Sequence, residues 1–173
     1  MTDSTGPAAQ SSATFRLLDT LFADEPMRAV WSETATVMAW LDVEAALAAA
    51  QAEVGLISAA DAEAIGAVCR VENIDLPALW AGARTVGYPI LPLVRQIAAL
   101  LPPGPSGRVH YGVTTQDIMD SGLALQLGRS CDRLVELTTQ FGDALAALAV
   151  EHSGLVMAAR THGQQAVPTT FGA

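Results

Sequence analysis

The stretch ARTHGQQAVPTTFGA, residues 159–173, holds the densest polar chemistry in the sequence, centred on His162. The polar neighbours of this histidine are Arg160, Thr161, Gln164 and Gln165. A histidine titrates near neutrality, so small changes in its surroundings let it give or take a proton. The stretch therefore predicts either a proton-transfer site at His162 or a histidine satisfied by backbone hydrogen bonds in a turn made by Gly163.

A second polar stretch, HYGVTTQDIMD at residues 110–120, precedes a long helical pattern. Thr114 and Asp117 have the spacing of a capping box, and Gly112 gives the loop its turn. The free N–H groups of a helix start, together with the hydroxyls of Thr114 and Thr115, would also suit an anion, especially a carboxylate. The two interpretations are compatible, because one threonine can cap the helix while the other faces a ligand.

Helices must position these stretches, because alanine and leucine are abundant and strand signals are almost absent. The sequence predicts a short helix over residues 14–22 and a longer one that begins at Ser32 and ends near Gly55. A smaller helix is expected to begin at Ser58. The longer helix is predicted to have one apolar face, made by Met38, Leu41, Ala45, Ala48 and Ala52. Gln51 is expected to lie off this face.

Pro77, Pro89 and Pro92 are expected to divide the next segment into short helices, and the Pro/Gly cluster at 102–107 predicts a loop. These features predict a flexible tail at 1–14, an N-terminal helical domain at 15–107 and the beginning of a second helical domain at 108–173.

A single long helix is predicted from Thr115 to about Ser153, with an apolar face at Leu134, Leu137, Phe141, Leu145 and Leu148. Its length is on the order of 55 Å. A globule of this chain length is roughly 30–35 Å wide. The helix therefore needs packing partners, either more chain or other subunits. His152, at the end of this helix, suits a helix-dipole role.

Composition excludes several classes of function. A net charge of −9 argues against nucleic acid. No window approaches the roughly 18 apolar residues of a membrane span, and the N-terminus lacks the features of a secretory signal. Scattered histidines predict no metal site. Cys69 and Cys131 are expected to be reduced, buried thiols in a cytoplasmic protein.

The two polar stretches, in this order, resemble the first two signature regions of the fumarase/aspartase superfamily, on the strength of HYGVTTQD and RTHGQ…PTTFG. Two further stretches resemble the 3-carboxy-cis,cis-muconate cycloisomerase branch of the superfamily, to which adenylosuccinate lyase is closely related: WLDVEAALAAAQAEVGLI and YPILPLVRQ. The resemblance implies an all-α fold, in which an N-terminal helical domain precedes a bundle of long helices. It also implies homotetramers whose active sites gather residues from three subunits.

The same resemblance implies anti addition or elimination of a C–N or C–O bond next to a carboxylate, without a cofactor. Carried over by position, a loop that holds a substrate carboxylate contains Thr114, Thr115 and Gln116, with His110 just behind it. Thr161 and Gln164 would also contact the substrate. His162 would be the counterpart of the histidine that assists proton transfer to the leaving group.

The sequence departs from the pattern of each branch. Muconate cycloisomerases often carry tryptophan where His162 stands, so this residue favours the lyases, whereas TTQD and PILPLVR favour the cycloisomerases. The RHDV stretch of adenylosuccinate lyases is replaced by VGYPILPLV. The third signature, a GSS loop with the catalytic serine base, belongs downstream of PTTFG. The chain is therefore expected to be the N-terminal portion of an enzyme and to be inactive alone.

These observations favour lactonisation of 3-carboxy-cis,cis-muconate, or a related reaction of a small polycarboxylate. The alternatives are an adenylosuccinate lyase-like C–N lyase and a non-catalytic helical scaffold that kept the packing of the superfamily.

Overall fold

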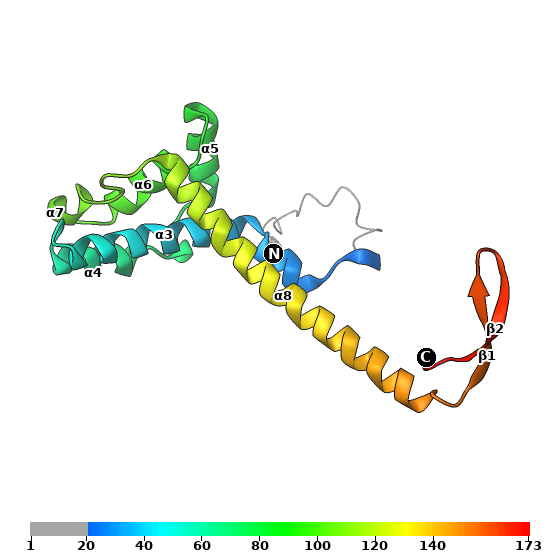
Figure 1. Cartoon of the computed structure of the whole chain (residues 1–173). Helices are drawn as coiled ribbons and strands as arrows, with labels where there is room; N and C mark the ends of the chain where they lie inside the picture. Colours follow the sequence, from blue (N-terminus) through cyan, green and yellow to red (C-terminus); the bar gives the residue numbers. More distant parts are fainter. Residues whose placement is uncertain (1–20) are drawn as a thin grey trace, which may run out of the picture. The chain divides into compact units, whose positions relative to one another are not determined.

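The computed structural model describes residues 21–173, so the predicted tail and most of the helix predicted at 14–22 lie outside the described residues. The described chain forms two compact units, residues 21–126 and residues 127–173. The division falls inside the longest described helix, α8 (Thr115–Glu151) (Figure 1). The domain boundary expected between residues 107 and 108 stays a prediction.

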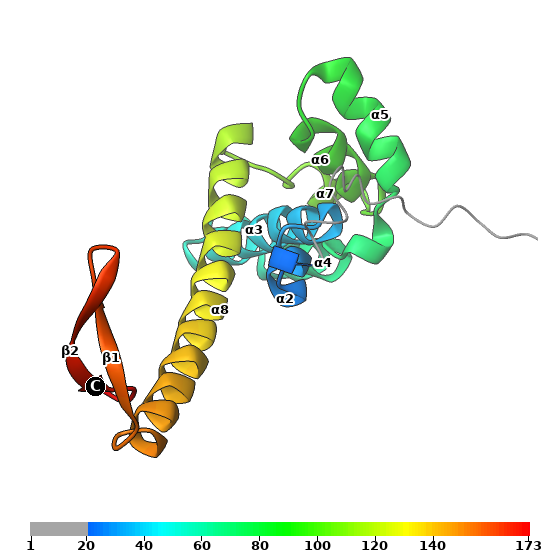
Figure 2. The same ribbon diagram turned by 90° about the vertical axis from the view of Figure 1, so that its right-hand side faces the viewer.

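The first unit is built from helices (Figures 1 and 2). α3 packs against α4, α5 against α6, and the short α7 contacts both α4 and α6. The elements are α2 (Glu25–Val30), α3 (Glu33–Glu53), α4 (Ala59–Val68), a 3₁₀ turn (Val71–Asn73), α5 (Leu76–Val86), α6 (Ile90–Ala99), α7 (Pro103–Ser106) and the start of α8. The all-α class is confirmed for this unit.

Serine side chains set the helix starts that the sequence predicts. Ser32 Oγ accepts the Ala35 N–H at 3.2 Å and begins α3, and Ser58 Oγ accepts the Asp61 N–H at 3.0 Å and begins α4. Each serine satisfies one of the N–H groups that a helix start leaves without an intrahelical partner. Beyond the end of α3, Gly55 has a φ of +75°, which favours glycine.

The apolar face predicted for α3 is partly wrong. Leu41 and Ala48 are buried, but Met38 is 42% exposed. The buried face includes two polar residues, Glu44 and Gln51, although Gln51 was expected to lie off it. These two side chains are buried because residues 110 and 111, far away in sequence, supply hydrogen-bond partners. Periodicity along one helix cannot reveal such partners.

The proline-rich segment also differs from expectation. Pro92 lies inside the first turn of α6 and does not break it, because the first turn has N–H groups without intrahelical acceptors, so a proline there removes no hydrogen bond. The cluster at 102–107 is not only a loop: Pro103–Ser106 form the single turn of α7. Proline at the first helical positions is already preset to helical φ.

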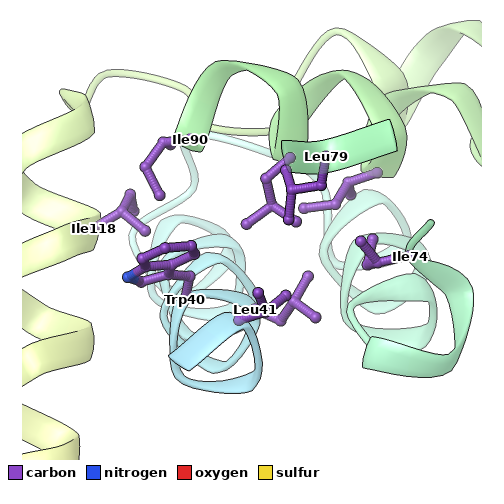
Figure 3. Close-up of a cluster of buried hydrophobic side chains, with 9 residues drawn as sticks. Trp40, Leu41, Ile74, Leu79, Ile90 and Ile118 are labelled. Atoms are coloured by element: carbon purple, nitrogen blue, oxygen red, sulfur yellow. The ribbon is translucent and has the colours of Figure 1, made fainter. Parts of the chain in front are cut away.

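The core of the first unit fixes the start of α8. Ile118, in the first turn of α8, is 1% exposed and lies beside Trp40 of α3 and Ile90 of α6 (Figure 3). One turn later Gly122 meets the same tryptophan: a Cβ built there would lie 2.7 Å from Trp40 Cδ1. The absence of a side chain at Gly122 therefore lets α8 and α3 approach closely.

We expect Gly122→Ala to lower the free energy of unfolding by about 1–3 kcal/mol, because the added methyl group overpacks the contact with Trp40. Gly128→Ala is the matched control on the same helix, since a Cβ there meets nothing within 4 Å. It should stabilise the helix by about 0.5–1 kcal/mol. Thermal unfolding followed by circular dichroism measures both, and equal effects of the two substitutions would contradict the close contact.

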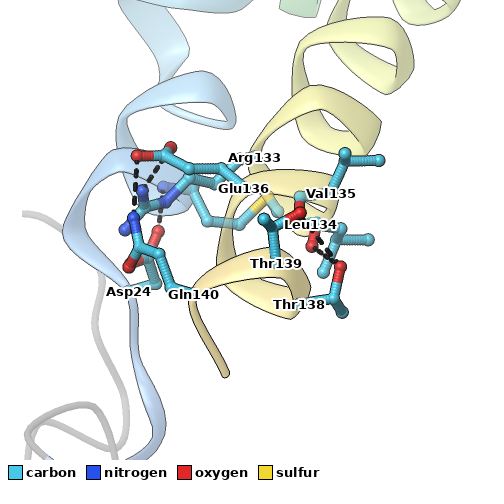
Figure 4. Close-up of polar contacts among 9 residues, drawn as sticks. Asp24, Arg133, Leu134, Val135, Glu136, Thr138, Thr139 and Gln140 are labelled. Carbon is cyan, nitrogen blue, oxygen red and sulfur yellow. Dashed lines mark hydrogen bonds and ion pairs between the residues drawn. The ribbon is translucent and has the colours of Figure 1, made fainter. Parts of the chain in front are cut away.

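The second unit consists of α8 from Leu127 onward and a β-hairpin. The single long helix predicted from Thr115 is confirmed. Several of its side chains bond within the helix: Arg133 pairs with Glu136, and the hydroxyl of Thr138 donates to the Leu134 carbonyl (Figure 4). The predicted apolar face is largely uncovered in this structure, with Phe141 65% exposed.

The hairpin is the main element that the sequence did not indicate. β1 (Val156–Thr161) pairs antiparallel with β2 (Gln164–Thr170). Its strands carry few of the alternating apolar residues that identify a strand, and Pro168 within β2 weakens the signal further. In the register, Ala158 pairs with Pro168 and Arg160 with Gln165, so two residues of β2 oppose one of β1 as a β-bulge.

The base of the hairpin closes on the end of α8. The Phe171 ring meets the His152 ring edge-to-face at 5.3 Å, and the Phe171 N–H donates to the Leu155 carbonyl at 2.9 Å. A Cβ at Gly172 would lie 2.1 Å from the Ala149 carbonyl oxygen, so only glycine fits this backbone. Phe171 and Gly172, near the end of the polar stretch 159–173, therefore have a packing role.

Candidate functional site

The turn that leads into α8 has two residues in the left-handed region of the backbone, His110 with φ +59° and Gly112 with φ +74°. Glycine adopts such a conformation without penalty, but an L-residue with a side chain rarely does. His110 must therefore be held by its surroundings. The conformation of this turn decides where the following threonines begin the helix.

Thr114 and Asp117 form the reciprocal box that their spacing predicts. The Thr114 N–H and hydroxyl both donate to Asp117 Oδ2, at 2.8 and 2.9 Å, and the Asp117 N–H donates to Thr114 Oγ1 at 3.4 Å. The backbone hydrogen bond from Thr114, followed by the hydroxyl, holds the pKa of Asp117 below its usual value; His110 adds a smaller effect in the same direction. The capping interpretation of this motif is confirmed.

The box leaves Thr115 as the threonine available to a ligand. Its hydroxyl makes no hydrogen bond with residues 21–173, whereas both donors of Thr114 are taken by Asp117. Gln116 is exposed and donates to Asp120 Oδ1 at 2.7 Å. The first N–H groups of an α-helix lack intrahelical partners. Together with the Thr115 hydroxyl they can receive an anion.

A buried acid stands behind this turn. Glu44 of α3 is 1% exposed, and its Oε1 lies 2.6 Å from His110 Nδ1. Burial raises the pKa of the Glu44 carboxyl, and the hydrogen bond and charge of His110 oppose that shift. Two turns along α3, Gln51 Nε2 donates to the Tyr111 carbonyl at 2.6 Å. Sequence reasoning missed Glu44 as part of the site.

The second group of predicted residues lies at the tip of the hairpin. His162 and Gly163 form the two-residue turn between β1 and β2, and Gly163 has the φ of +77° that glycine allows. This confirms that Gly163 makes the turn at His162. The tip residues form a shallow, open hollow and are all exposed: Arg160, Thr161, His162, Gly163 and Gln164. The hollow is polar and can present an imidazole, a hydroxyl, an amide and a guanidinium to a ligand.

The structure thus gathers His110, Thr114, Thr115 and Gln116 in the first unit, and Thr161, His162 and Gln164 in the second. Over residues 21–173, no group of three or more His, Cys, Asp or Glu side chains is arranged to hold a metal ion. Within the same range, every helix is too short or too polar to cross a membrane. Cys69 and Cys131 are free thiols, but the expected burial is wrong for Cys131, which is exposed. Burial first, then the charges of Glu44 and Asp42, raise the pKa of Cys69 to about 12.

Comparison with known families identifies the class of protein. The family model described as Lyase matches residues 21–173, which is every residue that the structure describes. The chain belongs to this lyase family of the fumarase/aspartase superfamily. The resemblance found in the two polar stretches is thereby confirmed.

Individual relatives carry different activities in their names. Trans-aconitate decarboxylase 1 of Mycosarcoma maydis is 37% identical over 90% of this chain and 31% of its own length. 3-Carboxy-cis,cis-muconate cycloisomerase of Pseudomonas aeruginosa is 39% identical over 91% of this chain and 35% of its own. Adenylosuccinate lyases are also among the relatives. The chain spans about a third of the length of the curated relatives it matches.

A solved structure supports the fold. The 3-carboxy-cis,cis-muconate lactonizing enzyme of Pseudomonas putida superposes with a TM-score of 0.83 at 35% identity, over 91% of this chain and 36% of that one. The all-α class with a long-helix region is therefore shown by the fold neighbours as well as by the helices themselves.

We expect Asp117→Asn to lower the thermal midpoint at pH 7 by a few degrees at most, because the amide keeps an acceptor but loses the charge at the helix start. The pKa of Asp117 is lowered in the folded chain, so its charge stabilises the fold above the unfolded-state value and this contribution is lost as the pH falls through the folded-state value. The difference between variant and wild type should therefore vanish in acid. Unfolding curves from pH 7 to pH 2 measure it, and a difference that persists at pH 2 would contradict the role of the charge.

Proposed function

We propose that this chain supplies the N-terminal part of a cycloisomerase or lyase that acts on a small polycarboxylate, with 3-carboxy-cis,cis-muconate as the leading substrate. The observation that carries the proposal is the start of α8, where the Thr114–Asp117 box leaves the Thr115 hydroxyl and the N–H groups of Thr115 and Gln116 for a carboxylate. Membership of the lyase family and the cycloisomerases among the relatives support the reaction class.

The substrate carboxylate would be received by the 110–116 turn. Thr115 donates its hydroxyl, and Gln116 offers an amide at the same helix start. His110 stands behind them with one ring nitrogen held by Glu44. Thr114 would contribute through its place in the turn, since its own donors are occupied by Asp117.

The hairpin tip would carry the proton transfer. In lactonisation, a carboxylate oxygen of the substrate forms a C–O bond to one carbon of a double bond, and the neighbouring carbon gains a proton. In the elimination direction, the C–O or C–N bond breaks and the neighbouring carbon loses its proton. In the elimination of an amine or alcohol, His162, exposed at the tip, would give a proton to the leaving nitrogen or oxygen, with Thr161 and Gln164 orienting the substrate. The attacking carboxylate oxygen of a lactonisation carries no proton, so His162 would there contact that oxygen without a net proton transfer to it.

We further propose that the active enzyme is a homo-oligomer, a tetramer in its complete form, that needs no cofactor. The two candidate groups flank a helix of 37 residues, which is on the order of 55 Å long. Its exposed apolar residues support packing against other helices. Residues 1–173 alone should show no turnover, because the resemblance assigns the partner base of His162 to a downstream serine loop.

The second candidate is an adenylosuccinate lyase-like C–N lyase, which the histidine at position 162 favours. A nucleotide substrate needs cations for its phosphate, and the chain has nine Lys and Arg in all. Assaying the complete enzyme with both substrates decides between them. Turnover of adenylosuccinate without turnover of the muconate would overturn the leading proposal.

We expect His162→Asn to lower kcat of the complete enzyme by roughly 10²- to 10⁴-fold, the usual loss when a general acid or base is removed.

Thr115→Val should instead raise KM by roughly ten- to a hundredfold, because one hydrogen bond to a charged substrate group is lost. The change in substrate absorbance measures both constants.

Thr85→Val is the matched control for the threonine, since this exposed hydroxyl bonds only to the Ala81 carbonyl of its own helix. It should leave both constants unchanged. Full activity of His162→Asn and Thr115→Val would contradict the roles proposed for these two residues, whereas absence of turnover in the wild type would favour the non-catalytic scaffold.

We expect the chain to self-associate through the apolar face of α8, whose members Leu134, Phe141, Leu145 and Leu148 are all more than two-fifths exposed. The double substitution Phe141→Gln with Leu145→Gln should reduce the association, whereas Thr139→Gln on the same stretch of helix should not. Sedimentation velocity measures the molecular mass in each case. A monodisperse wild-type monomer would count against the bundle interpretation.

A further inference from the structure

Burying the Glu44 carboxylate costs desolvation free energy, and within the described residues it has one hydrogen-bond partner, His110. Its Oε1 contacts His110 Nδ1, while Oε2 is buried without a hydrogen-bond partner in the described part of the chain. A buried carboxylate costs free energy unless it is paired. An apolar residue at this position of the α3 face would avoid that cost, so packing alone does not account for a glutamate.

The contact with Glu44 fixes which nitrogen of His110 faces outward. An ionised Glu44 can only accept at Oε1, so with Glu44 ionised the 2.6 Å contact places the proton on His110 Nδ1. The other nitrogen, Nε2, makes no hydrogen bond within residues 21–173. The buried unpaired side-chain atoms in the same range are Glu44 Oε2 and Gln51 Oε1. Nε2 is therefore accessible to solvent.

The surrounding contacts hold the ring in that orientation. His110 adopts a left-handed φ of +59°, and α3 fixes this part of the turn at two points, through the Glu44 carboxylate and through Gln51 to the Tyr111 carbonyl. The other charged groups nearby are Asp117 on α8 and Arg108 in the turn, whose guanidinium lies 5.9 Å from the Tyr111 ring centre. Glu44 is the one that contacts the imidazole directly.

We infer that Glu44 is a positioning residue for the carboxylate-binding turn: it keeps the proton on His110 Nδ1 and presents His110 Nε2 to the substrate carboxylate. Nε2 of the neutral ring is a hydrogen-bond acceptor, so it is the imidazolium, with both nitrogens protonated, that donates Nε2–H to a carboxylate, and the Glu44 carboxylate is then its counter-charge at Nδ1. His110 then binds a substrate carboxylate next to the Thr115 hydroxyl, and Glu44 acts only through His110. The substrate contact rests on the proposed function, whereas the state of the ring does not.

The state of the ring can be measured in the 173-residue chain without any activity. The chain has three histidines, so ¹⁵N–¹H correlations of the imidazoles can be assigned by substituting His152 and His162. At high pH, neutral His110 should carry its proton on Nδ1 in the wild type. Glu44→Leu should abolish this preference, because it removes the acceptor. Gln51→Leu is the matched control: it removes the other contact from α3 to the turn and should leave the tautomer of His110 unchanged.

A wild-type ring protonated on Nε2, or a tautomer unchanged in a folded Glu44→Leu chain, would overturn the inference. The wild-type measurement alone decides the first point if Glu44→Leu does not fold, as circular dichroism would reveal.

Kinetics of the complete enzyme test the positioning role. Glu44→Gln keeps the volume and removes the charge, so KM should rise roughly ten- to a hundredfold with little change in kcat. Unchanged KM in Glu44→Gln would show that the pair is structural only and would overturn the positioning role. Absence of turnover in the wild type with every substrate would overturn the proposed function, while the tautomer would still test the Glu44–His110 pair.

Discussion

The pairing of a buried carboxylate with one histidine is the constraint on which the 110–116 turn depends. Glu44 loses its water when α3 packs into the core, and His110 is the partner that compensates for this loss. To reach Glu44, His110 takes a backbone conformation that few non-glycine residues adopt. The turn is thus determined by a polar contact inside the fold, and the position of Thr114 and Thr115 follows from that turn.

The start of α8 is held in a complementary way by apolar contacts. Ile118 is buried beside Trp40, and Gly122 lets the two helices approach without a side chain between them. The Thr114–Asp117 box orients the first turn above this contact. Because both packing and capping fix this helix start, it would lose little conformational entropy when a ligand binds. Such preorganisation suits the anion site proposed here.

Local signals along the chain predicted the helices well. Ser32, Ser58 and the Thr114–Asp117 pair each act within three residues of themselves, so sequence spacing alone indicates them. Glu44 and Gln51 could not be predicted in the same way, because their partners lie 66 and 60 residues away. A lone acid on the apolar side of α3, between Leu41 and Ala48, is the one signal that could have drawn attention to Glu44.

The hairpin was missed for a different reason. Its strands are mostly exposed, and β1 begins with a run of apolar residues, 156–159, so they lack the alternation that marks a strand with one buried face. The turn at Gly163 was correctly expected because glycine is a local signal, but pairing of the strands on either side is not local. Roles for His162, Thr161 and Gln164 remain predictions that rest on the resemblance and on their exposure at the tip.

The two groups of candidate residues, one in each unit, therefore differ in what holds them. His110 and Thr115 stand on a unit with its own core, so their geometry is set within the chain. In residues 127–173 the large apolar side chains are mostly exposed, and the hairpin is fixed mainly at its base by Phe171 and Gly172. A catalytic histidine needs a geometry held to a fraction of an ångström. In the role proposed for it, His162 would reach that precision only when other helices cover the exposed face, so the proposed carboxylate binding would depend on folding of the chain and the proposed proton transfer on assembly.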